Sequence, residues 1–185
     1  MMLSDLDIAI TRGINSGAGQ WPGLDHLMIW TSALGVPLLV AAVAAQWWSG
    51  DPRRRTRHVL VAAGLSFLLG LALNQLVLLF VHRMRPYDAG VTRLMIERSA
   101  DFSFPSDHAT STFAIAATFL IYGKLRWGLA FLAASALVVV SRVYVGTHYL
   151  SDVLGGALTG IAAASAVRST YLEGTRLDRF VTGVL

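Results

Sequence analysis

The sequence contains no cysteine and few charged residues. The absence of Cys excludes disulfide bonds, thiolate zinc sites, iron–sulfur clusters and a thiol nucleophile. Only 14% of the 185 residues are charged, against about 25% in soluble globular domains, and 55% are hydrophobic. The net charge of +4 comes from Arg residues at the ends of apolar runs and not on one polar face, which argues against nucleic-acid binding. The composition therefore predicts a membrane protein with several spans.

Five apolar stretches approach the length that a membrane-spanning helix needs. A helix rises about 1.5 Å per residue and the hydrocarbon core is about 30 Å thick, so one span takes roughly 20 residues. The expected spans are 24–48, 58–81, 106–122, 127–144 and 148–167. The third is short, because only 109–122 is free of charge, and its first turn is expected at the membrane surface. We predict an all-α integral membrane protein with a bundle of about five transmembrane helices over 24–167.

The segments on either side of this bundle are more polar. Within 1–19, apolar residues recur at spacings of three and four, at Leu3, Leu6, Ile10 and Ile14. This pattern is typical of an amphipathic helix, which we place in the membrane interface. Residues 168–185 contain no recognisable motif and are interpreted as a cytoplasmic tail. Because the sequence has no internal repeat or long linker, we expect residues 1–185 to form a single membrane-embedded domain.

The positions of Lys and Arg predict the orientation, since cytoplasmic loops carry an excess of both. Basic residues fall after spans one, three and five, at Arg53, Arg54, Arg55, Arg57, Lys124, Arg126, Arg168, Arg176 and Arg179. The N-terminus is therefore expected outside the cell and the C-terminus in the cytoplasm. With this topology the connections 82–105 and 141–149 both open on the extracytoplasmic side.

Ionisable residues gather at the outer ends of the later spans, at Arg85, His108, Arg142 and His148. Such residues are costly in a membrane and indicate function by default. Ser106 follows a proline and is well placed as a helix N-cap, where free N–H groups attract anions. A capped helix with a solvated histidine would show the same pattern. On this segment alone, both interpretations remain open.

His148 and Asp152 are four residues apart, so on a helix they would share a face. A carboxylate that accepts from one imidazole nitrogen fixes the tautomer and leaves the other nitrogen free as base or nucleophile. A purely structural hydrogen bond would have the same spacing. The planar guanidinium of Arg142 suits phosphate oxygens. Two histidines and one aspartate among arginines make a poor cation site, so no metal is expected.

Together these residues resemble the three-part signature of the phosphatidic acid phosphatase type 2 superfamily. Its last part, Ser-Arg-x5-His-x3-Asp, matches 141–152 at every defined position. Its middle part usually reads Pro-Ser-Gly-His, and here Asp107 replaces the Gly. Its first part reads Lys-x6-Arg-Pro, and Leu78 stands at the Lys position before Arg85. Arg83 is the candidate to replace that Lys, in an arrangement that resembles the bacitracin-resistance type of undecaprenyl-diphosphate phosphatase.

The resemblance implies the helical core of the phosphatase and haloperoxidase fold, and a lipid phosphatase that needs neither metal nor cofactor. It implies that His148 attacks phosphorus to form a phosphohistidine, with Asp152 supporting its imidazolium and His108 as general acid. The implied phosphate-binding residues are Arg85, Arg142, Ser106, Asp107, Arg83 and Ser141. The expected substrate is a polyprenyl diphosphate or another phosphorylated lipid, above all undecaprenyl diphosphate. Its hydrolysis at the outer face of a bacterial plasma membrane would recycle the cell-wall lipid carrier and confer bacitracin tolerance.

Three alternatives remain open at the level of the sequence. The substrate may instead be phosphatidylglycerophosphate, phosphatidate or a lipid A phosphate, or the phosphohistidine may transfer its phosphate to another acceptor. The third alternative is a non-catalytic transporter or assembly subunit. The oligomeric state is open as well. Within the spans, Asn74 is expected to form an interhelical hydrogen bond, and Gly156 and Gly160 to admit a neighbouring helix closely.

Overall fold

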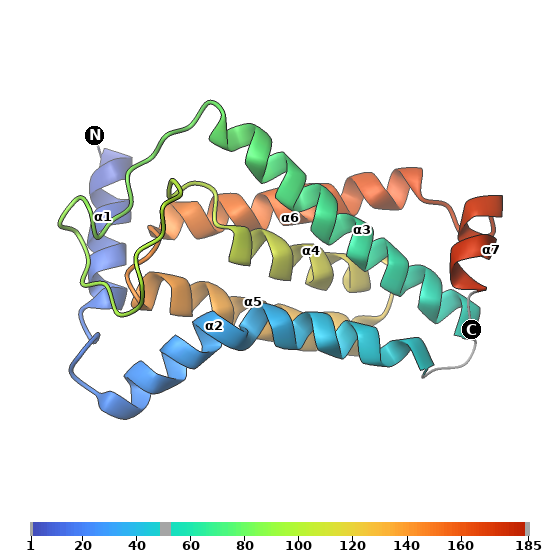
Figure 1. Ribbon diagram of the computed structural model, residues 1–185, viewed down its shortest axis with the longest axis horizontal. Helices are drawn as coiled ribbons and strands as arrows, with labels where there is room; N and C mark the ends of the chain where they lie inside the picture. Colours follow the sequence, from blue (N-terminus) through green and yellow to red (C-terminus); the bar gives the residue numbers. More distant parts are fainter. Residues whose placement is uncertain (1, 49–52, 184–185) are drawn as a thin grey trace.

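The computed structural model describes residues 2–48 and 53–183, and all regular structure in these ranges is helical (Figure 1). The elements are α1 (Met2–Asn15), α2 (Pro22–Ala45), the short 3-10 helix η1 (Gln46–Trp48), α3 (Arg53–Leu78), α4 (Asp107–Ile121), α5 (Leu125–Tyr144), α6 (Leu150–Thr170) and α7 (Arg176–Thr182). The prediction of an all-α membrane bundle is confirmed.

Four of the five expected spans are helices long and apolar enough to cross a membrane: Pro22–Trp48, Arg54–Leu78, Leu125–Tyr144 and Leu150–Thr170. The expected third span corresponds to α4, whose 15 residues extend over only about 22 Å at 1.5 Å per residue. Figure 1 shows α4 between α3, α5 and α6, which all pack against it. Because its neighbours cover it, α4 does not have to match the thickness of the bilayer.

Glycines on α6 let α4 approach closely. A Cβ on Gly156 would lie 2.4 Å from the carbonyl oxygen of Ser106, and one on Gly160 would lie 2.4 Å from that of Thr110. These distances are far below a normal van der Waals contact, so no larger residue fits without displacing the backbone. The predicted packing role of the two glycines is confirmed, and it holds the start of α4 against α6.

A second contact fixes the same end of α4 to α3. The side-chain amide of Asn74 donates to Asp107 Oδ1 at 2.6 Å and to Thr110 Oγ1 at 2.9 Å. This confirms the predicted interhelical hydrogen bond. The first turn of α4, which carries His108, is thus held from both sides.

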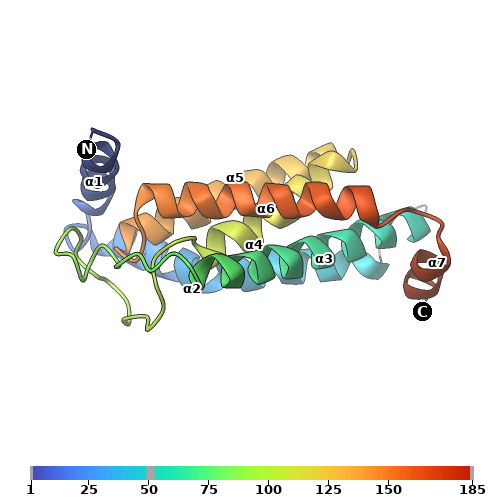
Figure 2. The ribbon, with the colours of Figure 1, turned by 90° about the horizontal axis from the view of Figure 1, so that it is seen from above.

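Helices α1 and α7 lie at opposite ends of the bundle (Figure 2). Helix α1, within the segment expected to be interfacial, lies across the end that also carries the long connection 79–106. At the other end, α6 continues to Thr170, three residues beyond the expected span. The remaining tail includes α7, which packs against the start of α3.

Candidate active site

A cavity of about 130 Å³ lies at the end of the bundle that carries α1. It is lined by Leu78, Arg85, Ser99, Asp101, Phe102, Pro105, Asp107, His108, Arg142 and His148. A water molecule takes about 30 Å³ of the liquid, so the cavity holds roughly four waters, which is enough for a phosphate group and too little for a lipid tail. Five of the nine residues expected in the site therefore meet in one small cavity, although they come from four separate segments of the chain.

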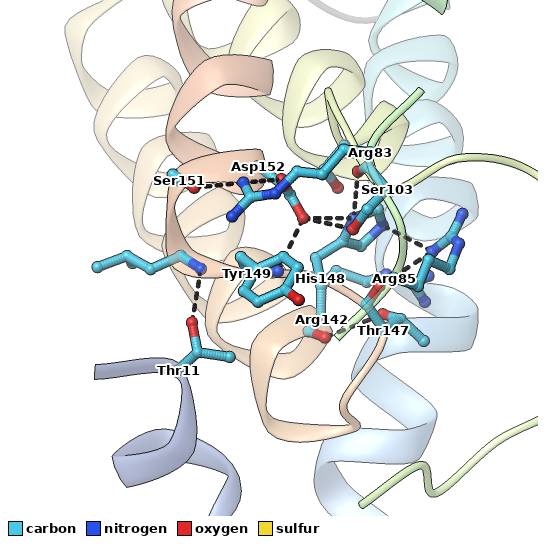
Figure 3. Close-up of polar contacts among 12 residues, drawn as sticks. Thr11, Arg83, Arg85, Ser103, Arg142, Thr147, His148, Tyr149, Ser151 and Asp152 are labelled. Carbon is cyan, nitrogen blue, oxygen red and sulfur yellow. Dashed lines mark hydrogen bonds and ion pairs between the residues drawn. The ribbon is translucent and has the colours of Figure 1, made fainter. Parts of the chain in front are cut away.

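The buried imidazole of His148 is held in one tautomer. His148 lies in the turn between α5 and α6, and its Nδ1 is 2.8 Å from the carbonyl oxygen of Ser103 (Figure 3). A carbonyl only accepts, so Nδ1 carries the hydrogen and Nε2 keeps its lone pair. Burial lowers the pKa of His148, and the nearby Arg142 and Arg85 lower it further against the opposing effect of Asp152. The ring is therefore neutral at pH 7, with Nε2 available as a nucleophile.

Asp152 contacts this histidine differently from the expected helical pairing. His148 precedes α6, and its Nδ1 lies 3.7 Å from Asp152 Oδ2, which is too long for a hydrogen bond. The same carboxylate oxygen instead accepts from Ser103 Oγ at 2.5 Å and from the backbone N–H of Tyr149 at 2.8 Å. The second of these bonds belongs to a capping box at the start of α6, which draws the carboxylate back onto its own helix. Ser103, which the sequence did not single out, therefore links Asp152 to the imidazole.

Two arginines from different elements point their charge into the cavity. Arg85 is buried and donates to neutral acceptors only, with its Nη1 3.1 Å from the carbonyl oxygen of Thr147 and 3.5 Å from His148 Nε2. Arg142 at the end of α5 donates to Ser32 Oγ at 2.5 Å, and its buried Nε has no hydrogen-bond partner among the described residues. Neither arginine forms an ion pair within the described ranges.

The carboxylates in the lining do not cancel these charges. Asp101 and Asp107 are exposed to solvent, and Asp107 is already bonded to Asn74. Water and ions screen exposed charges strongly and buried ones weakly, so the buried arginines dominate inside the cavity. The cavity is therefore suited to a small, multiply charged anion.

The start of α4 adds His108 and a set of free backbone groups. His108 is half-buried in the first turn and lines the same cavity as His148. Ser106 is the N-cap residue as expected, but its side chain makes no cap hydrogen bond, and its buried Oγ has no partner in the described part of the chain. The backbone N–H of Ser106 donates to the carbonyl oxygen of Asp152 at 3.1 Å.

Two residues expected to bind phosphate lie outside the cavity lining. The first is Ser141, whose buried Oγ donates to the carbonyl oxygen of Val138 at 2.7 Å within α5. The second is Arg83, which is described below. Leu78, at the position where the related signature has Lys, does line the cavity. An apolar side chain thus stands where a further cation was expected.

Arg83 lies behind Asp152, on the side away from the cavity (Figure 3). Its Nη1 is 2.6 Å from Asp152 Oδ1, and its Nη2 is 2.7 Å from Asp7 Oδ2 of α1. The guanidinium stacks 3.9 Å above the ring of Tyr149. Burial alone would lower the pKa of Arg83, but its bonds to the two carboxylates raise it, so the pair stays charged. Arg83 therefore supports the carboxylate that supports the histidine.

Helix α1 also caps the start of α6. Asp7 Oδ1 accepts from the backbone N–H of Ser151 at 2.9 Å, and Thr11 Oγ1 accepts from that of Leu150 at 3.0 Å. The first N–H groups of a helix have no partner within it, so these contacts complete its N-terminus. No motif in the sequence connects α1 with α6, which is why Asp7 and Thr11 were not among the expected site residues.

A helical membrane bundle that encloses a neutral histidine and two buried arginines in a phosphate-sized cavity defines a membrane-embedded phosphatase. The model of the PAP2 superfamily, the type 2 phosphatidic acid phosphatases, matches residues 59–176. The chain belongs to the PAP2 superfamily. Its activity class is that of a phosphatase, a hydrolase acting on phosphorylated lipids.

One curated relative and two solved structures illustrate the similarity. The chain is 34% identical over 139 residues to the undecaprenyl-diphosphatase BcrC of Bacillus subtilis (strain 168), which covers 75% of this chain and 70% of the relative. A PAP2-type phosphatidylglycerolphosphate phosphatase from Bacillus subtilis superposes with a TM-score of 0.70 at 23% identity, over 95% of this chain and 89% of the other. Aquifex aeolicus LpxE gives 0.66 at 23% identity, over 89% and 95%. At these identities the two structures establish the fold.

Proposed function

We propose that this phosphatase hydrolyses undecaprenyl diphosphate to undecaprenyl phosphate and inorganic phosphate, through a phosphohistidine on His148. The observation that carries the mechanism is the bond from His148 Nδ1 to the carbonyl of Ser103, which leaves the Nε2 lone pair inside the cavity. The substrate is supported by the 34% identity to an undecaprenyl-diphosphatase. The activity would recycle the cell-wall lipid carrier and give tolerance to bacitracin.

In the first half-reaction, Nε2 of His148 attacks the terminal phosphorus, and the bond from that phosphorus to the bridging oxygen breaks. The bonding electrons leave with the lipid phosphate, and His108 donates the proton that this oxygen takes up. Arg85 and Arg142 hold the equatorial oxygens while negative charge spreads over them in the transition state. The positive charge on the phosphorylated ring is stabilised by the Ser103 carbonyl at 2.8 Å and by Asp152 at 3.7 Å.

In the second half-reaction, water attacks the phosphohistidine and His108 accepts a proton from it. The N–P bond breaks, its electrons return to Nε2, and phosphate leaves. The two arginines supply the positive charge in both steps, so we propose that the reaction proceeds without a metal. Ser106 and the N–H of Asp107 at the start of α4 are the further proposed phosphate contacts. Ser141 has no proposed contact with phosphate, because its hydroxyl is bonded inside α5.

We place the active site on the extracytoplasmic side. Most basic residues of the connections lie at the opposite end of the bundle, where α3 begins and α6 ends. The positive-inside rule then makes that end cytoplasmic and the cavity end external. A diphosphate headgroup would enter the cavity from the outer interface, and its polyprenyl tail would remain in the bilayer.

Phosphate release by the purified full-length protein in detergent, with excess EDTA, tests this proposal. The substrates to compare are undecaprenyl diphosphate, phosphatidylglycerophosphate and phosphatidate. We expect chelator-resistant release that is fastest with undecaprenyl diphosphate. Preference for phosphatidylglycerophosphate, the substrate named for the superposed Bacillus subtilis structure, would contradict the proposed substrate. Activity abolished by EDTA and restored by a divalent metal would contradict the metal-free mechanism.

Replacing Arg83 by Ala is expected to lower kcat on the order of tenfold or more while KM stays nearly constant, because Asp152 loses a bond that holds it beside His148. A direct phosphate ligand would instead raise KM. The matched control is Arg98→Ala, which removes an exposed ion pair with Asp88 and is expected to change neither constant by more than about twofold. Arg83→Lys should restore part of kcat. Equal, small effects of Arg83→Ala and Arg98→Ala would remove Arg83 from any role in catalysis.

A further inference from the structure

A second histidine–aspartate pair is buried at the end of the bundle opposite to the active site, where α3, α6 and α7 meet (Figures 1 and 2). His58 of α3 is only 1% exposed, and its Nδ1 lies 2.7 Å from Asp178 Oδ1 of α7. The imidazole stacks on the ring of Tyr171 at 4.6 Å between centroids, and the ring of Tyr122 meets it edge-on at 5.3 Å. The ring is therefore held in place on three sides.

Two polar atoms of this cluster have no hydrogen-bond partner among the described residues. They are His58 Nε2 and the hydroxyl oxygen of Tyr122, and both are buried. Asp178 cannot supply the missing partner, because its carboxylate lies at the Nδ1 edge of the imidazole and also accepts from the hydroxyl of Tyr171 and the N–H of Gly174. Buried polar groups without partners are rare in native proteins and indicate a missing ligand or water.

Both residues line a cavity of about 290 Å³, which we call the α7-end cavity. Its lining also contains Arg55 of α3, Arg168 of α6 and Glu173. This volume is more than twice the 130 Å³ of the catalytic cavity, so a headgroup-sized anion fits. With two arginines against one exposed carboxylate, the lining carries an excess of positive charge.

We propose that the α7-end cavity binds a phosphate group, carried by an anionic phospholipid headgroup or free in solution. Arg55 and Arg168 pair with the phosphate oxygens, and the hydroxyl of Tyr122 donates to one of them. His58 Nε2 accepts from a protonated phosphate oxygen, or donates to an ionised one as an imidazolium whose charge Asp178 balances. Either form satisfies both buried atoms. The site shares no residue with the catalytic cavity and is independent of the proposed function.

Nuclear magnetic resonance of the ring nitrogens tests the proposal on the full-length protein with 15N-labelled histidine. The chain has five histidines, so the His58 signals are identified by their loss in His58→Gln. If that variant does not fold, they are identified by exclusion with variants of the other four. One arm titrates inorganic phosphate into detergent-solubilised protein. The other compares phosphatidylcholine nanodiscs with and without phosphatidylglycerol.

We expect the His58 signals to shift saturably in one of these arms. A shift with inorganic phosphate identifies free phosphate as the ligand, and a shift only with phosphatidylglycerol identifies the lipid headgroup. Arg55→Gln is expected to weaken binding at least tenfold, whereas Arg54→Gln, its neighbour on α3 outside the lining, leaves it unchanged. Arg142→Ala in the catalytic cavity should also leave the His58 titration unchanged.

Two results would overturn the proposal. The first is the absence of any His58 shift in both arms, which would assign the unpaired atoms to ordered water. The second is an equal loss of binding in Arg55→Gln and Arg54→Gln, which would reduce the effect to the general charge of this end of the bundle.

Discussion

The variant His148→Ala is expected to lower kcat for phosphate release from undecaprenyl diphosphate by at least about 10⁴-fold, because it removes the proposed nucleophile. Only one hydrogen bond of the fold is lost, the one to the carbonyl of Ser103. The thermal unfolding temperature should therefore stay close to that of the wild type. Rapid quenching with radiolabelled substrate should trap an acid-labile, base-stable phosphoprotein in the wild type and none in this variant.

The matched control for this variant is His82→Ala. His82 lies in the same connection as the site, but it is exposed and packs against Phe102 with 4.6 Å between ring centroids. We expect nearly unchanged turnover and the same phosphoprotein. If His148→Ala still formed the phosphoprotein, or kept more than about 1% of wild-type kcat, the nucleophile would have to be another residue, since loss of a covalent nucleophile removes far more activity than this.

The second large effect is expected for Arg142→Ala, which should lower kcat by about 10²- to 10³-fold, the usual loss when one oxyanion donor is removed. The guanidinium is held by Ser32, and its buried Nε has no other partner among the described residues, so it is oriented before substrate binds. Steady-state kinetics of phosphate release measure the loss. Added guanidinium ions are expected to restore part of the activity.

Arg126→Ala is the matched control for Arg142→Ala. Arg126 lies on the same helix, α5, but at its other end, and it is exposed to solvent. Its removal changes the net charge equally, so the general electrostatic effect on an anionic substrate is the same. Similar kinetics for the two variants would show that Arg142 acts only through long-range charge and makes no contact with the transferred phosphate.

The residues of the cavity could be selected from the sequence because their signals are local. Arg85, His108, Arg142 and His148 each stand at the end of an apolar run, where an ionisable side chain needs a reason. All four line the cavity. The same logic found Asn74 as a polar contact between helices, since a buried amide in a span has to bond to a neighbouring helix.

The supporting contacts could not be selected in this way. The spacing of His148 and Asp152 suggested a direct pairing on one helical face, but α6 begins only at Leu150, so the two residues do not belong to the same helix. Arg83 was assigned to phosphate because it stands near a missing Lys in the chain. The position of Asp152 and Asp7, one on each side of its guanidinium, directs it away from the cavity.

Apolar runs, basic loops and residue spacing determine the membrane bundle and the main residues of its cavity, because each depends on neighbours in the chain. Packing of distant segments determines which atom orients the nucleophile and which side chains support it. Arg83 and Asp7 are 76 residues apart in the chain, and His58 and Asp178 are 120 apart. No local pattern encodes such pairs, since they meet only when α1 and α7 dock on the two ends of the bundle. The tertiary structure alone therefore decides that Arg83 supports Asp152 and that a second histidine–aspartate pair lies at the opposite end of the bundle.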